Sequence, residues 1–247
     1  MKSAELLQMV WFTASQTPLK AAEVYRALLE VEPDGSQINR NVNPADPILN
    51  TANGLLDGIA VELQIRPGRA DLLLRPAEAG AGAPEIPTIG IEASIAALRN
   101  YAGNIHKAVE ATTRISLISR LLEKTESAAA ATQRVLESVQ VEIRAPNISD
   151  SLFQINSRVP LANGLEVNRI MRFEAAAIQT YAVNLNQLAQ SLFPVIQEQN
   201  YMVMQLDINT VPLTGVMTQD QINSAFEFIS EETLRLALAA SPQGLQE

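Results

Sequence analysis

The sequence predicts an α+β fold, in which a largely antiparallel sheet carries long helices on one face. Short apolar segments that alternate with polar residues recur along the chain, and segments of helical periodicity separate them. Turn signals join several alternating segments directly, which is typical of antiparallel hairpins. Because 247 residues suffice for one extensive core, we expect one continuous globular unit built from two halves, residues 1–110 and 111–247.

The first half is expected to begin with a strand over 6–14, which is apolar on both alternating faces. Thr17 and Pro18 are typical of a helix start, and this helix is expected to end near Val31. Residues 33–54 contain prolines and asparagines with little periodicity, which predicts a long loop.

A hairpin follows this loop. Residues 58–66 alternate between apolar and polar side chains, Pro67-Gly68 suits a type II turn, and residues 72–75 return as the partner strand. Residues 77–90 are rich in glycine and proline and predict a flexible tether. An amphipathic helix is then expected over 91–109.

The second half repeats this outline. Thr218 and Gln221 form a capping-box pattern at the start of the final helix, which is expected to run to about Leu236. The other expected elements are strands over 113–122, 151–159, 165–181 and 201–209, and helices over 125–139 and 184–198. The shared order suggests a duplicated strand-helix-hairpin-helix unit.

Composition excludes several classes of function. The net charge of −9, from 18 basic and 27 acidic side chains, repels phosphate backbones, so we expect no binding to nucleic acid. The absence of cysteine excludes disulfides and thiolate metal sites. No segment has the unbroken apolar length of a membrane span, and the N-terminus lacks an export signal, so we expect a cytoplasmic protein without membrane contact.

No motif indicates a cofactor, a metal site or a catalytic residue. Gly80-Ala81-Gly82 is followed by prolines and not by a helix start, so it is interpreted as linker and not as a phosphate loop. His106 is the one histidine, and without a nucleophile motif it is interpreted as a surface residue.

Two sets of polar strand residues are candidates for a site. Asp207 and Asn209 share one strand face and, with Glu166 or Glu174, form a candidate site for a hard cation; a hydrated sheet face explains the same pattern. The second set is a candidate interaction surface made of Arg66, Arg114 and Arg120. Converging on an open sheet face, these arginines would receive an acidic peptide or a phosphate; the alternative is cross-strand pairing with Glu62, Glu166 or Glu174.

The segments Arg114-Ile115-Ser116-Leu117-Ile118-Ser119-Arg120 and Leu206-Asp207-Ile208-Asn209 are followed by a terminal helix containing Phe226 and Phe228. This layout resembles an uncharacterised, sporadically distributed prokaryotic family of similar length, with a central Arg-Ile-Gly-Leu-Arg-Tyr strand and a late Leu-Asp-Ile-Asp strand. Ser116 stands at the family's glycine and Asn209 at its second aspartate. The resemblance implies an adaptor or sensing role at mobile-element or defence-associated loci.

These observations favour a non-enzymatic binding or assembly protein, an adaptor or regulatory component that acts through protein–protein contacts. Its partner is another protein or a second copy of the chain, and the contact uses the sheet face, an exposed edge or the loop 33–54. One alternative is a carboxylate- or metal-dependent hydrolase built around Asp207. Another is a small-ligand sensor with an apolar cavity between sheet and helices.

Overall fold

The computed structural model describes residues 3–15, 17, 19–77, 86–102, 109–143, 148, 150–182 and 195–246. The strands are β1 (Ser3–Thr13), β2 (Gly35–Ile38), β3 (Asn50–Leu56), β4 (Ile59–Arg66), β5 (Arg69–Pro76), β6 (Ile89–Gly90), β7 (Thr112–Thr125), β8 (Leu152–Pro160), β9 (Glu166–Ala182) and β10 (Val195–Thr210). The helices are α1 (Ala21–Leu29), α2 (Ile91–Ala102), α4 (Ala128–Val139), α5 (Gln219–Ala239) and the short 3₁₀ helix η2 (Pro242–Gln246).

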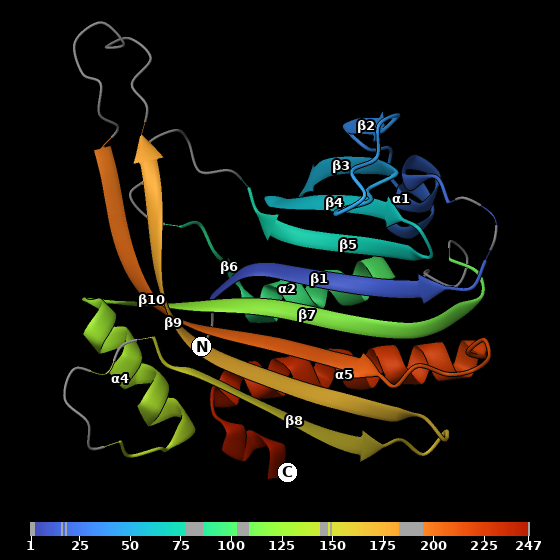
Figure 1. The fold of residues 1–247 in the computed structure, drawn as a ribbon. Helices are drawn as coiled ribbons and strands as arrows, with labels where there is room; N and C mark the ends of the chain where they lie inside the picture. Colours follow the sequence, from blue (N-terminus) through green and yellow to red (C-terminus); the bar gives the residue numbers. More distant parts are fainter. Residues whose placement is uncertain are drawn as a thin grey trace, which may run out of the picture.

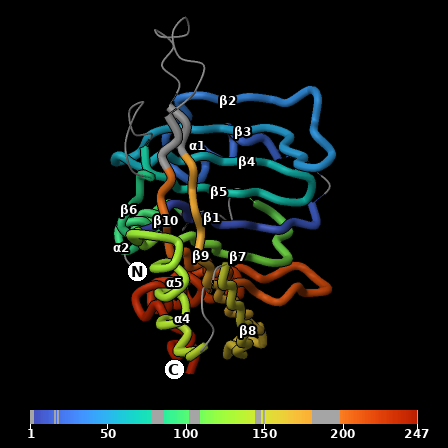
Figure 2. The backbone as a smooth tube through the Cα atoms, turned by 60° about the vertical axis from the view of Figure 1, so that its left-hand side comes forward, coloured from blue at the N-terminus to red at the C-terminus, as the bar shows by residue number. Residues whose placement is uncertain are grey.

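These strands form one ten-stranded sheet in which every pair is antiparallel (Figures 1 and 2). The order is β2-β3-β4-β5-β1-β7-β10-β9-β8, with β6 paired to one end of β1. The first half runs from β1 through α1 and the strands β3–β5 to α2, and the second half from β7 through α4 and the strands β8–β10 to α5. The sheet is therefore continuous across both halves, which meet where β1 pairs with β7.

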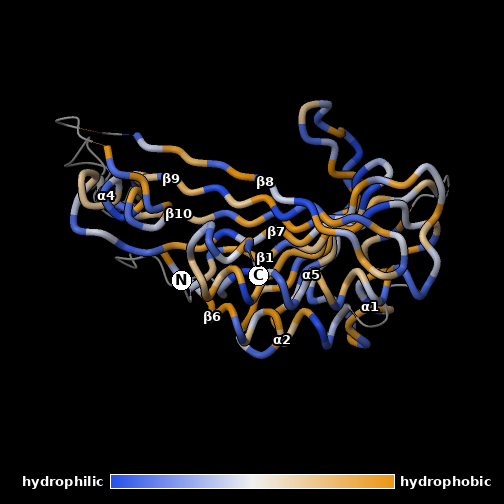
Figure 3. Tube along the Cα trace, turned by 90° about the horizontal axis from the view of Figure 1, so that it is seen from below, coloured by the Kyte–Doolittle hydropathy of each residue, from blue (hydrophilic) through white to orange (hydrophobic). Residues whose placement is uncertain are grey.

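All four α-helices among the described residues pack on the same face of the sheet. In β1 this face carries Leu7, Met9 and Trp11, which are fully buried. Their cross-strand partners in β5 and β7 belong to the same core, except the buried Ser119 opposite Leu7, and so do apolar residues of α1, α2, α4 and α5. Figure 3 shows α1, α2 and α5 together on this side. We call it the helix-covered face, and the opposite one, which carries Gln8, Val10 and Phe12, the helix-free face.

A buried ion pair fixes α5 and the C-terminus to the helix-covered face. Arg169 of β9 is only 5% exposed and donates to Glu232 of α5 at 2.9 Å, and it also donates to the Leu245 carbonyl. Arg235 donates to the same carboxylate at 2.7 Å. Burial alone raises the pKa of Glu232, but hydrogen bonds from Arg235 and Arg169 outweigh it, so the pKa is lowered.

Several sequence predictions are confirmed locally. The hairpin of β4 and β5 turns at Gly68, whose φ of 65° is the left-handed conformation that a type II turn requires. The capping box at Thr218 and Gln221 is present at the start of α5. The coarse α+β class holds, but most of the helices are not long: α1 has 9 residues, α4 has 12, and α2 has 12 up to the point where the described residues end.

The predicted loop over 33–54 is wrong at both ends, because β2 lies within it, β3 begins within it, and only residues 39–49 connect the two strands. β2 is the edge strand and β3 is the next one in, and they bury little apolar surface, so their sequence shows no clear alternation. The helix predicted over 184–198 is contradicted from Val195 onward, since these residues pair with the end of β9. Residues 184–194 lie outside the described part of the chain. None of the described helices has the length and apolarity to cross a membrane.

We predict that Glu232→Gln lowers the free energy of unfolding by about 3 kcal/mol at neutral pH, because Arg169 is left buried without its counter-charge. The pKa of Glu232 is lower in the folded protein than the ordinary 4.5, so its contribution is complete above that value and is lost as the pH falls through the folded value. Urea unfolding from neutral pH to below 4 should therefore show the two proteins converging. Glu227→Gln, exposed on the same helix, is the control and should behave as the wild type.

Candidate functional site

The helix-free face gathers most of the arginines that the strands carry. The strand register places on it Arg66, Arg69, Arg75, Arg114, Arg120, Arg158 and Arg172. Among the described strands, Arg169 alone points to the helix-covered face. The same face also carries the carboxylates Glu62, Asp71, Glu166, Glu174 and Asp207, so it gathers charges of both signs.

Almost all of these arginines have a carboxylate partner. Arg66 pairs with Asp46 and Asp71, Arg69 with Asp71, Arg75 with Glu62, Arg120 with Glu5, Arg158 with Glu166 and Arg172 with Glu174. Within the described residues, Arg114 makes no ion pair and no side-chain hydrogen bond, and its Nε is buried. It is therefore the arginine whose charge this face leaves uncompensated.

Arg114 lies against an aromatic ring at the junction of the two halves. Phe12 of β1 is directly opposite Arg69 of β5 on one side and Arg114 of β7 on the other. The guanidinium carbons of Arg69 and Arg114 lie 5.6 and 5.0 Å from the centre of the Phe12 ring. Each contact is a cation–π interaction worth about 0.5–2 kcal/mol. The ring holds two cations close together and only one of them, Arg69, has a carboxylate partner.

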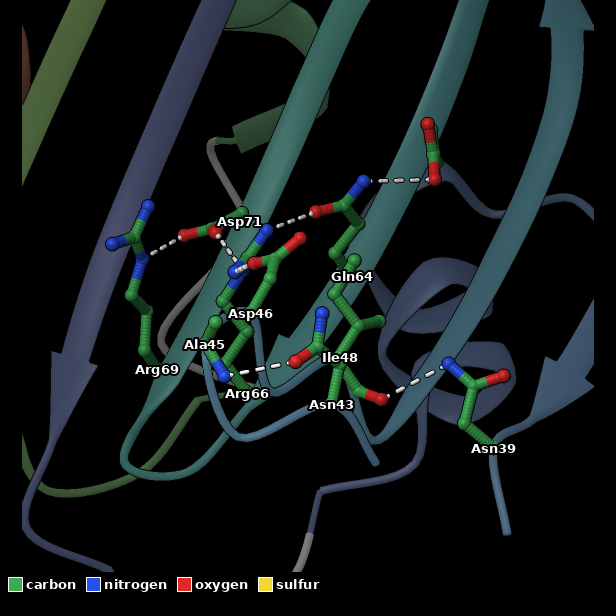
Figure 4. Close-up of polar contacts among 10 residues, drawn as sticks. Asn39, Asn43, Ala45, Asp46, Ile48, Gln64, Arg66, Arg69 and Asp71 are labelled. Carbon is green, nitrogen blue, oxygen red and sulfur yellow. Dashed lines mark hydrogen bonds and ion pairs between the residues drawn. The ribbon is translucent and has the colours of Figure 1, made fainter. Parts of the chain in front are cut away.

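Arg114, Phe12 and Arg69 form a row across the strands that continues to Arg66, where the loop 39–49 contacts it. Arg66 is paired across the β4–β5 turn with Arg69, and Asp71 lies fully buried beside both of them. Arg66 Nε lies 3.0 Å from Asp71, and the same guanidinium reaches Asp46 in the loop 39–49. Figure 4 shows this chain of contacts from Arg69 through Asp71 and Arg66 to Asp46. The loop is thus anchored to the helix-free face by one arginine.

A hollow of about 230 Å³ adjoins this row at the end of the strands. It is lined by Arg66, Arg69 and the turn between them, by Thr13, Ser15 and Thr17, and by the apolar Leu19, Leu49 and Ile65. Two further hollows lie at the C-terminal end of α4 and beside the start of β10. None of these three lies between the sheet and the helices α1, α2 and α5, where a ligand sensor would hold its ligand.

The three arginines of the predicted interaction surface share the helix-free face but do not all meet. Arg66 and Arg114 lie in one row across β4, β5, β1 and β7, whereas Arg120 lies farther along β7 and pairs with Glu5. Their predicted cross-strand partners Glu62, Glu166 and Glu174 are paired with other arginines. Sequence reasoning missed Phe12, Arg69 and Asp71. The Pro67-Gly68 turn was the available signal for Arg69, because it places Arg69 opposite Arg66.

The candidate cation site around Asp207 contains no converging carboxylates among the described residues. Asp207 and Asn209 share the helix-free face as predicted, but Asp207 Oδ1 accepts hydrogen bonds from Ser116 at 2.7 Å and from Asn209 at 2.9 Å. Glu166 and Glu174 are bound by arginines. No group of three metal-ligating side chains occurs in the described part of the chain. His106 and Gly80-Ala81-Gly82 lie outside the described residues.

Comparisons with protein-family models, with curated proteins and with solved structures found no match. We therefore base the proposed function on the geometry of the helix-free face.

We predict that Asp71→Asn lowers the free energy of unfolding by about 3 kcal/mol, because it removes the buried counter-charge of Arg66 and Arg69. Hydrogen exchange should also accelerate at the Leu49 amide, which bonds to the Ile65 carbonyl where the loop returns to the sheet. Asp46→Asn, at the exposed end of the same contacts, should cost less than about 1 kcal/mol. Equal losses for the two variants would contradict the central role of Asp71.

We predict that Asp207→Ala destabilises the protein by about 2 kcal/mol, because Ser116 and Asn209 are left as buried donors without an acceptor. Millimolar Mg²⁺ or Mn²⁺ should leave the melting temperature of wild type and variant unchanged. A cation-dependent rise in the wild type that Asp207→Ala abolishes would instead support the hydrolase alternative.

Proposed function

We propose that this chain is a binding or assembly protein that acts through protein–protein contacts and uses its helix-free face to engage an acidic segment of its partner. The observation that supports this proposal is the uncompensated Arg114, held beside Arg69 by the Phe12 ring. An uncompensated guanidinium on a rigid sheet is ready to form a charge-assisted, bidentate hydrogen bond with a carboxylate.

The surroundings of Arg114 favour a protein segment as the ligand. Phe12 is half-buried and offers apolar surface next to the charge, and the hollow beside Arg69 has room for a further side chain. A carboxylate flanked by apolar groups matches this combination. The net charge of −9 repels a long polyphosphate much more strongly than a short acidic segment. Nucleic acid is therefore the less favoured ligand.

The proposal also concerns how two similar units of the chain together form the helix-free face. We infer that the chain consists of two copies of one strand-helix-meander-helix unit, because the strand order from β3 through β5 to β1 is mirrored from β8 through β10 to β7. The site around Phe12 takes Arg69 from the first unit and Arg114 from the second. Binding would then depend on both halves, as expected of an adaptor whose contact surface exists only when the sheet is complete.

We predict that random dodecapeptides selected on the immobilised wild-type protein are enriched in Asp and Glu. Their affinity should fall about tenfold or more for Arg114→Gln, which removes the charge and the planar donor pair. Arg114→Lys, which keeps the charge alone, should give an intermediate loss. Fluorescence anisotropy with the selected peptides measures each affinity, and binding should weaken as salt is raised.

Arg75→Gln is the matched control. Arg75 lies on the same face and is exposed, but it is paired with Glu62 at 3.5 Å, so its loss should leave peptide binding nearly unchanged. The melting temperature of Arg114→Gln should fall by only a few degrees, since the cation–π contact with Phe12 is lost but no ion pair of the described residues is. Selected peptides without acidic residues, or an affinity that Arg114→Gln does not change, would refute the proposal.

A further inference from the structure

The strand β8 forms one edge of the sheet and is open along its outer side. All nine of its residues pair with β9, from Leu152 opposite Glu174 to Pro160 opposite Glu166, without a register shift. Among the described residues no strand and no backbone hydrogen bond lies on its other side. Natural edge strands are usually shortened, bulged, or protected by lysine or proline within the strand. β8 has neither a bulge nor a proline before its last residue, and Arg158 is its one charged residue.

The side chains of β8 also leave apolar surface only partly covered. Phe153, Ile155 and Val159 point to the helix-covered face and pack against the core, but all three are only partly buried. On the helix-free face Leu152 is 57% exposed. An additional strand beside β8 would satisfy its free backbone groups and cover these side chains together.

We propose that a second copy of this chain supplies that strand, so that the two copies of β8 pair antiparallel and form one continuous sheet through the dimer. The register with the longest overlap places a two-fold axis at Asn156. It sets Asn156 of one copy opposite Asn156 of the other, Gln154 opposite Arg158, and Phe153 opposite Val159. An isologous contact of this kind closes after two copies.

The charges of β8 fit a second copy. Arg158 is its one charged residue, and it is drawn towards β9 by hydrogen bonding to Asn168 at 3.1 Å and by pairing with Glu166. In the proposed register Arg158 faces a neutral glutamine, so no like charges lie opposite each other. Phe153 faces Val159 and Leu152 faces Pro160, so most apolar residues face apolar ones, and Ile155 faces the small Ser157.

The edge contact is independent of the proposed binding of acidic segments. Arg114 lies on β7 at the centre of the sheet, and β10 and β9 separate that strand from β8. The affinities of the two contacts should also change in opposite directions as salt is added. Two chains of net charge −9 repel each other, so added salt should strengthen the dimer, whereas it should weaken the contact of Arg114 with a carboxylate.

The test uses sedimentation velocity of the full chain over a range of concentrations. The wild type should show a monomer–dimer equilibrium, and Asn156→Glu and Asn156→Lys should each raise the dimer dissociation constant on the order of tenfold, because like charges then meet at the axis. An equimolar mixture of the two variants should restore dimerisation, since opposite charges meet instead. Asn156 is exposed, so both variants should fold, and their melting temperatures verify this.

Gln37→Glu, exposed on β2 at the opposite edge of the sheet, is the control and should leave the dissociation constant unchanged. A wild type that remains monomeric at every concentration would overturn the proposal. A dimer that neither Asn156 variant weakens, or a mixture of the variants that stays monomeric, would overturn it as well.

Discussion

The antiparallel pairing of β1 with β7 is the contact on which the rest of this structure depends. It joins the first half of the chain to the second, and both strands are also paired on their other sides, to β5 and β10. Its helix-covered side contributes Leu7, Met9 and Trp11 to a core that reaches all four described helices. The same register brings Phe12 between Arg69 and Arg114 on the other side. Core and candidate site are thus two faces of one strand pair, which is why both require the complete sheet.

The arginines have different surroundings on the two faces of the sheet. On the helix-covered face Arg169 is buried, and its guanidinium is bound by Glu232, Ser157 and a backbone carbonyl. On the helix-free face most arginines pair with carboxylates at partly exposed positions, where each pair adds little stability, and the buried Asp71 between Arg66 and Arg69 is the exception. Arg114 departs from both patterns because an aromatic ring replaces the carboxylate. The ring contact leaves the buried Nε of Arg114 without an acceptor among the described residues, and this is the physical reason for assigning Arg114 to a partner.

An assembly role gives the sheet two uses at two places. In our proposals the centre of the helix-free face would bind an acidic segment, and the edge at β8, which no other described strand covers, would pair with a second copy. The first contact selects its ligand by charge and planar geometry. The second relies on backbone hydrogen bonds and on a self-complementary pattern of side chains. A dimer built through β8 would carry two copies of the Arg114 site and could therefore bind a partner bivalently.

Local patterns in the sequence determined much of the secondary structure. The alternation in β4, the Pro67-Gly68 turn and the capping box at Thr218 each act within a few residues, so they were readable without the fold. Predictions failed where long-range pairing decided the outcome. β3 is a strand because β4 offers it an edge, β2 is a strand because it pairs with β3, and Val195 extends β10 because the end of β9 is its partner. The same distinction between local patterns and long-range pairing applies to the candidate site. The face of Arg66, Arg114 and Arg120 was predictable from strand alternation, but the position of Phe12 between two arginines depends on strands far apart in the chain, and only tertiary structure brings them together.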